Sequence, residues 1–353
     1  MTNYSWTKQD GPDVLFGTGA QYFLPGPNSY EGKDYFEEFA KKGYSVSMNK
    51  TALDAIDTKE KALGVFCTGD LPTWLDRNVY TENLEDFEND PAGGEGPALD
   101  LPGLKDMTVK AVEILANRGS EDGFFLMSEA ASVDKQMHAQ DVDRALGDLL
   151  ELDDTVRATI DKLEELGILD ETLIVITADH GHAFDVWGSA DTKYLQEQED
   201  DRDKRRAIGT YEKSGLSQYT VRKEGVNYGT GPSFPVNWEP RYALAAGVAA
   251  FPDNVEDHKV NKDGSRQAAV GLNGEYYANV EDGVGGFLLN GTLSPTDSSG
   301  VHSLTDVAVY AWGPCQETFG GTYNNVDIFY KFANCLGMAR GKPDGCKAKR
   351  HHE

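Results

Sequence analysis

An alternation of strand, long helix and strand in the middle of the chain constrains its fold most. Two short apolar runs, GFFLMSE at 123–129 and TLIVITAD at 172–179, are typical of strands buried on both faces. Between them, over residues 141–166, apolar side chains recur at steps of three and four, which predicts a helix, and Gly167 follows where its end is expected. This order predicts a βαβ unit, and hence an α/β fold with a parallel sheet.

Polar residues that can carry chemistry follow both predicted strands. Open parallel sheets place their sites just beyond the carboxyl ends of the strands, so these residues are candidates for a functional site. They are Glu129, Asp134 and His138 after the first strand, and Asp179, His180 and His182 after the second. A third apolar run, at 306–314, reads as another strand, and His302 lies in the polar loop before it.

The spacing of these residues leaves two interpretations open. Asp134 and His138 are four residues apart at a predicted helix entry, so a carboxylate and an imidazole can converge on one face as zinc ligands. An exposed ion pair has the same spacing. In TADHGH (177–182), Gly181 allows a sharp turn that groups can approach closely, although a plain polar strand end is the alternative. The position after buried strands favours metal binding.

Charge and cysteine content narrow the function classes. The 353-residue chain has 33 Lys and Arg against 59 Asp and Glu, a net charge of −26, so we expect no nucleic acid partner. Residues 1–25 lack the basic start and apolar run of a signal peptide. Of the four cysteines, Cys335 and Cys346 flank a short Gly- and Pro-containing segment that could close a small disulfide loop. The sequence contains no C-x-x-C pair, so it does not predict a thiolate zinc site.

Two longer stretches, GFFLMSEAASVDKQMHAQD and LIVITADHGHAFD, together resemble the alkaline phosphatases, which are metal-dependent phosphomonoesterases. The similarity extends to PDVLFGTGAQYF, KALGVFCTGDLPTWLDR, LPGLKDMTVKAVEIL and VHSLTDVAVYAWGP. Other enzymes of the wider superfamily carry strings similar to TADHG, and the set Glu129, Asp134 and His138 distinguishes the phosphomonoesterases. The resemblance implies a parallel-rich, doubly wound sheet with helices on both faces. It also implies one domain over residues 1–353, with a loop-rich cap at about 210–300.

The same resemblance implies a site with two Zn²⁺ ions and one Mg²⁺ ion. Asp134, His138 and His302 match the ligands of the first zinc, and Asp179 and His180 match ligands of the second. Glu129 matches a magnesium ligand, Lys135 a residue that helps to hold phosphate, and His182 a residue close to the first zinc. Two zinc ions about 4 Å apart suit the hydrolysis of phosphate monoesters, because they stabilise the attacking and leaving oxygens.

Two parts of the family pattern have no match in this sequence. They are a first strand with a metal-bridging Asp, and a nucleophilic Ser at a helix start. We therefore expect an amino-terminally incomplete phosphatase domain with little or no turnover by itself. The string PTDSSG at 295–300 is turn chemistry and is not interpreted as the nucleophile. Uncovered strand edges and apolar helix faces predict an unstable or aggregation-prone chain.

Alternatives remain at the level of function. One is a non-catalytic homologue that keeps a single zinc as a structural or phosphate-sensing module. Another is a phosphodiesterase or sulfatase of the same superfamily. The resemblance further implies small phosphate monoesters as substrates, a homodimer, and a location outside the cytoplasm. Three N-x-S/T sequons, at Asn3, Asn49 and Asn290, are compatible with secretion.

Overall fold

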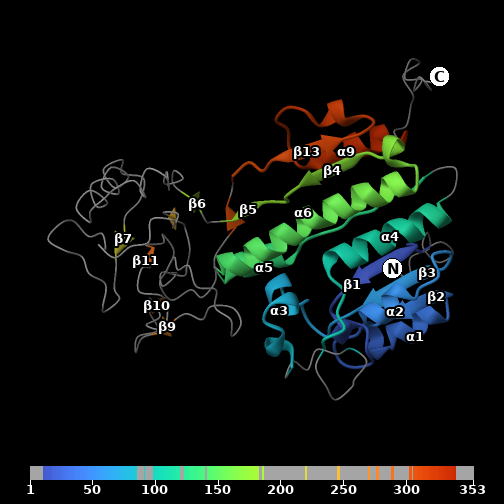
Figure 1. The fold of residues 1–353 in the computed structure, drawn as a ribbon, viewed down its shortest axis with the longest axis horizontal. Coiled ribbons are helices and arrows are strands. Elements are labelled where there is room, and N and C mark those ends of the chain that lie inside the picture. Colours follow the sequence, from blue (N-terminus) through green and yellow to red (C-terminus); the bar gives the residue numbers. More distant parts are fainter. Residues whose placement is uncertain are drawn as a thin grey trace. The chain divides into compact units, whose positions relative to one another are not determined.

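The structure is a computed structural model in which two compact units are described separately (Figure 1). Unit 1 comprises Met1–Lys162 and His182–Ser303, and unit 2 comprises Leu163–Gly181 and Leu304–Glu353. The described residues are 11–85, 91, 98–119, 123–139, 141–182, 185–186, 305–338 and the residue pairs 219–220, 245–246, 269–270, 276–277, 288–289 and 302–303. Within these ranges, no helix combines the length and the apolar character needed to cross a membrane.

Unit 1 contains a three-stranded parallel sheet with the order β1–β3–β2 (Figure 1). Its strands are β1 (Val14–Gly17), β2 (Tyr44–Ser47) and β3 (Lys61–Val65). Short helices connect them: η1 (Ala20–Tyr22), η2 (Tyr30–Gly32), α1 (Tyr35–Ala40) and α2 (Lys50–Asp54). Parallel strands need crossover connections, and these helices return the chain to the end of the sheet at which the preceding strand began. The parallel sheet with its helices is the α/β architecture that the sequence predicts.

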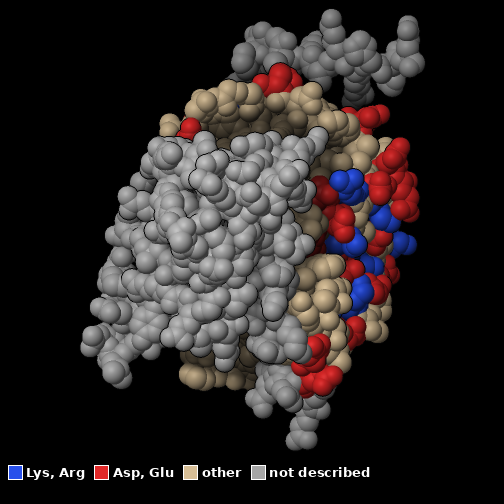
Figure 2. Space-filling model, turned by 60° about the vertical axis from the view of Figure 1, so that its left-hand side comes forward, with Lys and Arg blue, Asp and Glu red and all other residues tan. Residues whose placement is uncertain are grey.

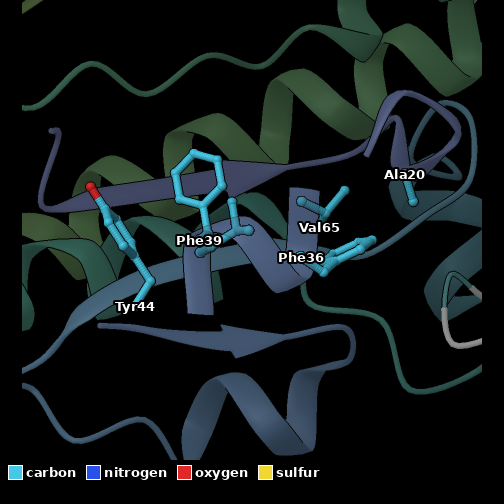
Figure 3. Packing of buried hydrophobic residues seen from close by; sticks show 6 residues of the cluster. Ala20, Phe36, Phe39, Tyr44 and Val65 are labelled. Atoms are coloured by element: carbon cyan, nitrogen blue, oxygen red, sulfur yellow. The ribbon is translucent and has the colours of Figure 1, made fainter. Parts of the chain in front are cut away.

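The central strand β3 is almost entirely buried. Successive side chains of a strand point to opposite faces of the sheet, so β3 contributes to the core on both faces. On one face, Leu63 and Val65 join a cluster with residues of η1, α1 and β2 (Figure 3). That cluster consists of Ala20, Phe36, Phe39, Tyr44, Leu63 and Val65. The cluster on the other face consists of Leu53, Ile56, Ala62, Phe66 and Ile114, and so includes residues of α2 and α4 (Leu104–Arg118). Helices therefore cover both faces, as in a doubly wound sheet.

Three short helices of unit 1, α1, α2 and α3, begin at residues whose side chains cap the backbone. Asp34 accepts a hydrogen bond from the Glu37 backbone N–H at 3.0 Å, and Asn49 accepts one from Ala52 at 2.8 Å. Thr73 caps α3 (Trp74–Asn78), which is followed by η3 (Thr81–Leu84). Such caps satisfy amide groups that have no partner inside the helix. The starts of these elements are thus encoded locally.

The predicted long helix is present, but the predicted strand before it is not. Helix α6 spans Val142–Glu165, and Gly167 follows with a φ of 70°. Residues 124–130 form no strand, and Phe125 and Met127 in this segment are 59% and 77% exposed. The prediction of a strand at 123–129 is wrong beyond a single β-bridge at Gly123, because an apolar run supplies side chains for burial but does not by itself supply a neighbouring strand. The chain passes directly into α5 (Ser132–His138).

Unit 2 contains an antiparallel pair of strands, β4 (Ile174–Thr177) and β13 (Val309–Trp312), in which Thr177 lies opposite Val309. Both strands fall inside the apolar runs that predict them. The expected parallel partner of β4 is replaced by this antiparallel one, since residues 124–130 are not a strand. The remaining helices of unit 2 are η4 (Leu169–Glu171), η5 (Gln316–Phe319) and α9 (Val326–Cys335).

A disulfide in unit 2 corrects the expected cysteine pairing. Cys335, at the end of α9, is bonded to Cys315, which precedes η5, with a Cα–Cα distance of 6.0 Å. The proposed partner, Cys346, lies outside the described residues. The turn between β13 and α9 brings Cys315 to the end of the helix, which proximity along the sequence does not reveal.

The predicted cap at about 210–300 lies outside the described residues except for isolated strands. Three antiparallel pairs are formed there or lead into it: β6 (Asp185–Val186) with β8 (Ala245–Ala246), β7 (Tyr219–Thr220) with β11 (Leu288–Leu289), and β9 (Ala269–Val270) with β10 (Tyr276–Tyr277). The cap therefore stays a prediction. On the described part of the face in Figure 2, acidic and basic side chains are interspersed.

Candidate metal site

Four side chains of unit 1 form a compact group of possible metal ligands: Asp134, His138, His182 and His302. Asp134 and His138 lie one turn apart on α5, as their spacing predicts. His182 ends strand β5 (Gly181–His182) and His302 begins strand β12 (His302–Ser303), and these two strands pair with one another. Each of the four residues offers one ligand atom, and all of these atoms lie within 4.8 Å of one another.

The distances within the group are short. His302 Nε2 lies 3.1 Å from Asp134 Oδ1 and 3.1 Å from His138 Nε2. His138 Nε2 is 3.4 Å from Asp134 Oδ2, and His182 Nε2 is 3.5 Å from Asp134 Oδ1. The nitrogen atoms of three imidazole rings and one carboxylate therefore converge on the same point.

The group is incompletely satisfied by its own hydrogen bonds. Asp134 Oδ1 is shielded from solvent and accepts no hydrogen bond from the described residues. Buried carboxylate oxygens are normally hydrogen-bonded, because burial without a partner is unfavourable. The Nε2 atoms of His138 and His302 also face one another, so one of them must act as an acceptor. A positive ion among these atoms would satisfy all of them at once.

The separations fit a tetrahedral zinc site. With ligand bonds of about 2.0–2.1 Å, the ligand atoms of a tetrahedron are about 3.3–3.4 Å apart. Four of the separations in the group, from 3.1 to 3.5 Å, lie close to that value, and all of the ligand atoms lie within 4.8 Å of one another. Imidazole with carboxylate is also a donor set that zinc accepts. The residues present thus fit a divalent metal ion of this type.

The other predicted ligands lie outside this group. Glu129 is exposed in the extended segment just before α5. Asp179 and His180 belong to unit 2, in the turn that follows β4. There the His180 backbone N–H donates to Asp179 Oδ1 at 3.0 Å, and His180 Nε2 lies 3.3 Å from Asp179 Oδ2. Asp179 and His180 therefore contact each other within that turn.

Lys135, the predicted phosphate contact, forms an ion pair with Asp70 in unit 1. Its Nζ lies 2.9 Å from Asp70 Oδ2, and the side chains are 50% and 67% exposed. The sequence interpretation did not include Asp70. Its position was a usable signal, because Asp70 follows β3 at the carboxyl end of a parallel strand, where polar residues gather.

His182 and Cys67 differ as possible metal ligands. His182 belongs to the compact group, whereas the sequence interpretation placed it only near the first zinc. Cys67 is a free, fully buried thiol after β3. Burial raises the pKa of this thiol to about 12. Cys67 is not part of the compact group of possible ligands, which consists of Asp134, His138, His182 and His302.

Comparisons with known proteins agree on one family. A family model for alkaline phosphatase matches residues 4–338. Alkaline phosphatase H of Pseudomonas aeruginosa is 33% identical over 179 residues, 49% of this chain and 37% of that protein. Alkaline phosphatase 3 of Bacillus subtilis is 26% identical over 325 residues, 90% of this chain and 56% of that protein.

A solved structure shares the fold. The crystal structure of Thermus thermophilus alkaline phosphatase matches with a TM-score of 0.51 at 18% sequence identity. The match covers 94% of this chain and 64% of that one. The matched region therefore spans less than two thirds of each of these three proteins.

Proposed function

Because the chain belongs to the alkaline phosphatase family, we propose that its metal site serves the hydrolysis of phosphate monoesters with two Zn²⁺ ions and one Mg²⁺ ion. The convergence of Asp134, His138, His182 and His302 is the observation that carries this proposal. When bound, zinc supplies an activated water and stabilises the oxygen that leaves.

The individual roles follow from the donor atoms and the resemblance. Asp134, His138 and His302 hold the first zinc, and His182 stands close enough to Asp134 to orient it or to share the ion. The second zinc is assigned to Asp179 and His180, and the magnesium to Glu129. The Lys135 ammonium group binds a phosphate oxygen, and Asp70 occupies that group as an ion-pair partner when no phosphate is present.

We propose little or no turnover for this chain by itself. Covalent phosphoryl transfer requires an activated nucleophile, and no Ser of the sequence matches the one that the family uses. One alternative has support of its own: a non-catalytic zinc-binding homologue. The four-residue group needs no nucleophile to hold an ion, so it suits that role equally well.

We place the protein in an oxidising compartment outside the cytoplasm. The disulfide between Cys315 and Cys335 supports this proposal, since such bonds persist mainly in secreted, cell-surface and periplasmic proteins.

Zinc content and activity of the purified chain test the proposal together. After removal of metal with a chelator, we expect the chain to bind Zn²⁺ in calorimetric titration and to hydrolyse p-nitrophenyl phosphate far more slowly than alkaline phosphatases do. His302→Ala should abolish binding at this site, whereas His352→Ala, near the end of the chain, should leave it unchanged. A wild-type chain that takes up no zinc contradicts the metal assignment. Rapid turnover would instead contradict the missing nucleophile.

A further inference from the structure

A second cluster of charges in unit 1 lies inside the protein. Arg144 of α6 is 0% exposed, and its guanidinium group contacts two buried carboxylates, Asp76 of α3 and Asp141 just before α6. Nε and Nη2 donate to Asp76 Oδ2 and Oδ1 at 3.0 and 2.8 Å, which is a bidentate arrangement. Nη1 donates to Asp141 Oδ2 at 3.0 Å. We call Asp76, Arg144 and Asp141 the buried triad.

Both carboxylates of the buried triad have further partners. Thr73 and Asn83 donate to the two oxygens of Asp76 at 2.6 and 2.8 Å. Burial raises the pKa of Asp76, but the hydrogen bonds from Arg144, Thr73 and Asn83 outweigh this effect and hold the pKa below its ordinary value. The carboxylate therefore stays charged. Burying such a triad is a poor means of gaining stability, because desolvation offsets most of the attraction.

Asp141 connects this triad to the helix that bears the metal ligands. Its backbone N–H donates to the carbonyl of Gln136 in α5 at 2.9 Å, and it follows His138 by three residues. Its side chain also accepts a hydrogen bond from the Arg144 backbone N–H at 3.1 Å, which caps α6. Asp141 therefore binds the guanidinium group of Arg144, caps the start of α6 and is hydrogen-bonded to the end of α5.

Helix α5 needs such an external support. It has seven residues, and its N-cap residue, Ala131, makes no side-chain cap. Helices of this length are unstable by themselves in water, so their position depends on tertiary contacts. Asp134 and His138 are placed correctly for one ion only while this turn of helix is intact.

We propose that Asp76, Arg144 and Asp141 are positioning residues for the metal site. They fix the end of α5, and with it the separation of Asp134 and His138. The inference rests on the proposed metal binding by these two residues. Side chains that orient metal ligands without contacting the ion typically change metal affinity about 10- to 100-fold when replaced.

The protein contains a matched control for this proposal. Arg77 of α3 and Glu151 of α6 form a second buried ion pair, with side chains 7% and 9% exposed. Among the described residues, the other side-chain hydrogen bonds of this pair run from Arg77 Nε to the Pro72 carbonyl and from the Leu104 N–H to Glu151 Oε1, not to α5. This pair joins the same two helices as the buried triad without reaching the metal ligands.

The test compares Asp141→Asn and Arg144→Met with Glu151→Gln in the full chain. Zinc affinity is measured by competition with a chelating dye, unfolding free energy by urea, and amide hydrogen exchange of α5 in the metal-free protein. We expect Asp141→Asn to weaken zinc binding at least 10-fold and to speed exchange in α5. Asn keeps the cap of α6 but not the charge, so this variant should fold even if Arg144→Met does not.

Glu151→Gln should lower stability while leaving zinc affinity within twofold and α5 exchange unchanged. Equal losses of affinity in Asp141→Asn and Glu151→Gln, or an unchanged exchange rate of α5 in Asp141→Asn, would overturn the positioning role. If the wild-type chain binds no zinc, the proposed function fails instead. The exchange comparison in the metal-free protein still decides whether the buried triad fixes α5.

Discussion

The buried triad and the compact group of possible metal ligands both bring carboxylates and nitrogen atoms together in unit 1, but their charges are satisfied in opposite ways. Arg144 brings a permanent positive charge to two buried carboxylates and aligns its donors with their oxygens. The ligand group has imidazoles in place of the guanidinium, and Asp134 Oδ1 is left without a hydrogen bond from the described residues. The buried triad therefore holds a permanent cation of the protein itself, whereas the other group offers a carboxylate and three imidazoles as possible ligands for an ion.

Removing the cation of the buried triad should have the largest effect. Arg144→Met leaves Asp76 and Asp141 buried without their counter-charge, so we expect the unfolding free energy to fall by about 3–5 kcal/mol. Adding Asp76→Asn should restore part of the loss, because a neutral amide needs no cation. Urea unfolding of the two variants measures both effects. A loss below about 1 kcal/mol for Arg144→Met would contradict the buried charge balance.

Adding a cation to the ligand group should have the next largest effect. At a zinc concentration 100 times the dissociation constant, the unfolding free energy of the wild-type chain should rise by about 2.7 kcal/mol. His302→Ala should show a clearly smaller rise, because the ion loses one of its donors. The comparison of melting curves with and without zinc measures the difference. Equal stabilisation of the two proteins would place the zinc elsewhere.

Asp148 is an intermediate case, a buried carboxylate without its own guanidinium. Its Oδ1 accepts the Trp74 N–H at 3.2 Å, while Oδ2 accepts no hydrogen bond from the described residues. Burial raises the pKa of this carboxyl group to about 6. The folded state therefore binds the proton more tightly than the unfolded state, and stability falls as pH rises from about 4 to about 6.

Asp148→Asn should remove this loss. We expect the variant to be more stable than the wild type by roughly 2 kcal/mol at pH 7.5 and to differ little at pH 4. Urea unfolding of the metal-free proteins at several pH values tests this. A difference that does not depend on pH would show that Asp148 is charged in the folded state throughout.

The exposed pair of Lys135 and Asp70 should show the smallest effect. Solvent screens both side chains, so Asp70→Asn should change the unfolding free energy by less than about 1 kcal/mol. It should still strengthen binding of inorganic phosphate to the zinc-loaded chain, because Lys135 no longer has a competing carboxylate. Calorimetric titration with phosphate measures this. Weaker binding would mean that Asp70 orients Lys135 instead of competing for it.

Local patterns predicted some elements of the fold well. The steps of three and four residues over 141–166 predict α6, observed at Val142–Glu165, and the apolar runs contain β4 and β13. The pairing of these strands was not predictable in the same way. The run at 123–129 has the composition of a strand, but a strand also needs a neighbour, and periodicity does not identify one.

The sequence by itself determined the donor groups of the candidate metal ligands and the family to which the chain belongs. Helix geometry also places Asp134 next to His138, because residues four apart share a face. Only the tertiary structure brought His182 and His302 to α5, paired Lys135 with Asp70, and placed Arg144 between two carboxylates. The reason is that backbone geometry encodes contacts within a few residues, whereas contacts between distant segments depend on how the whole chain packs.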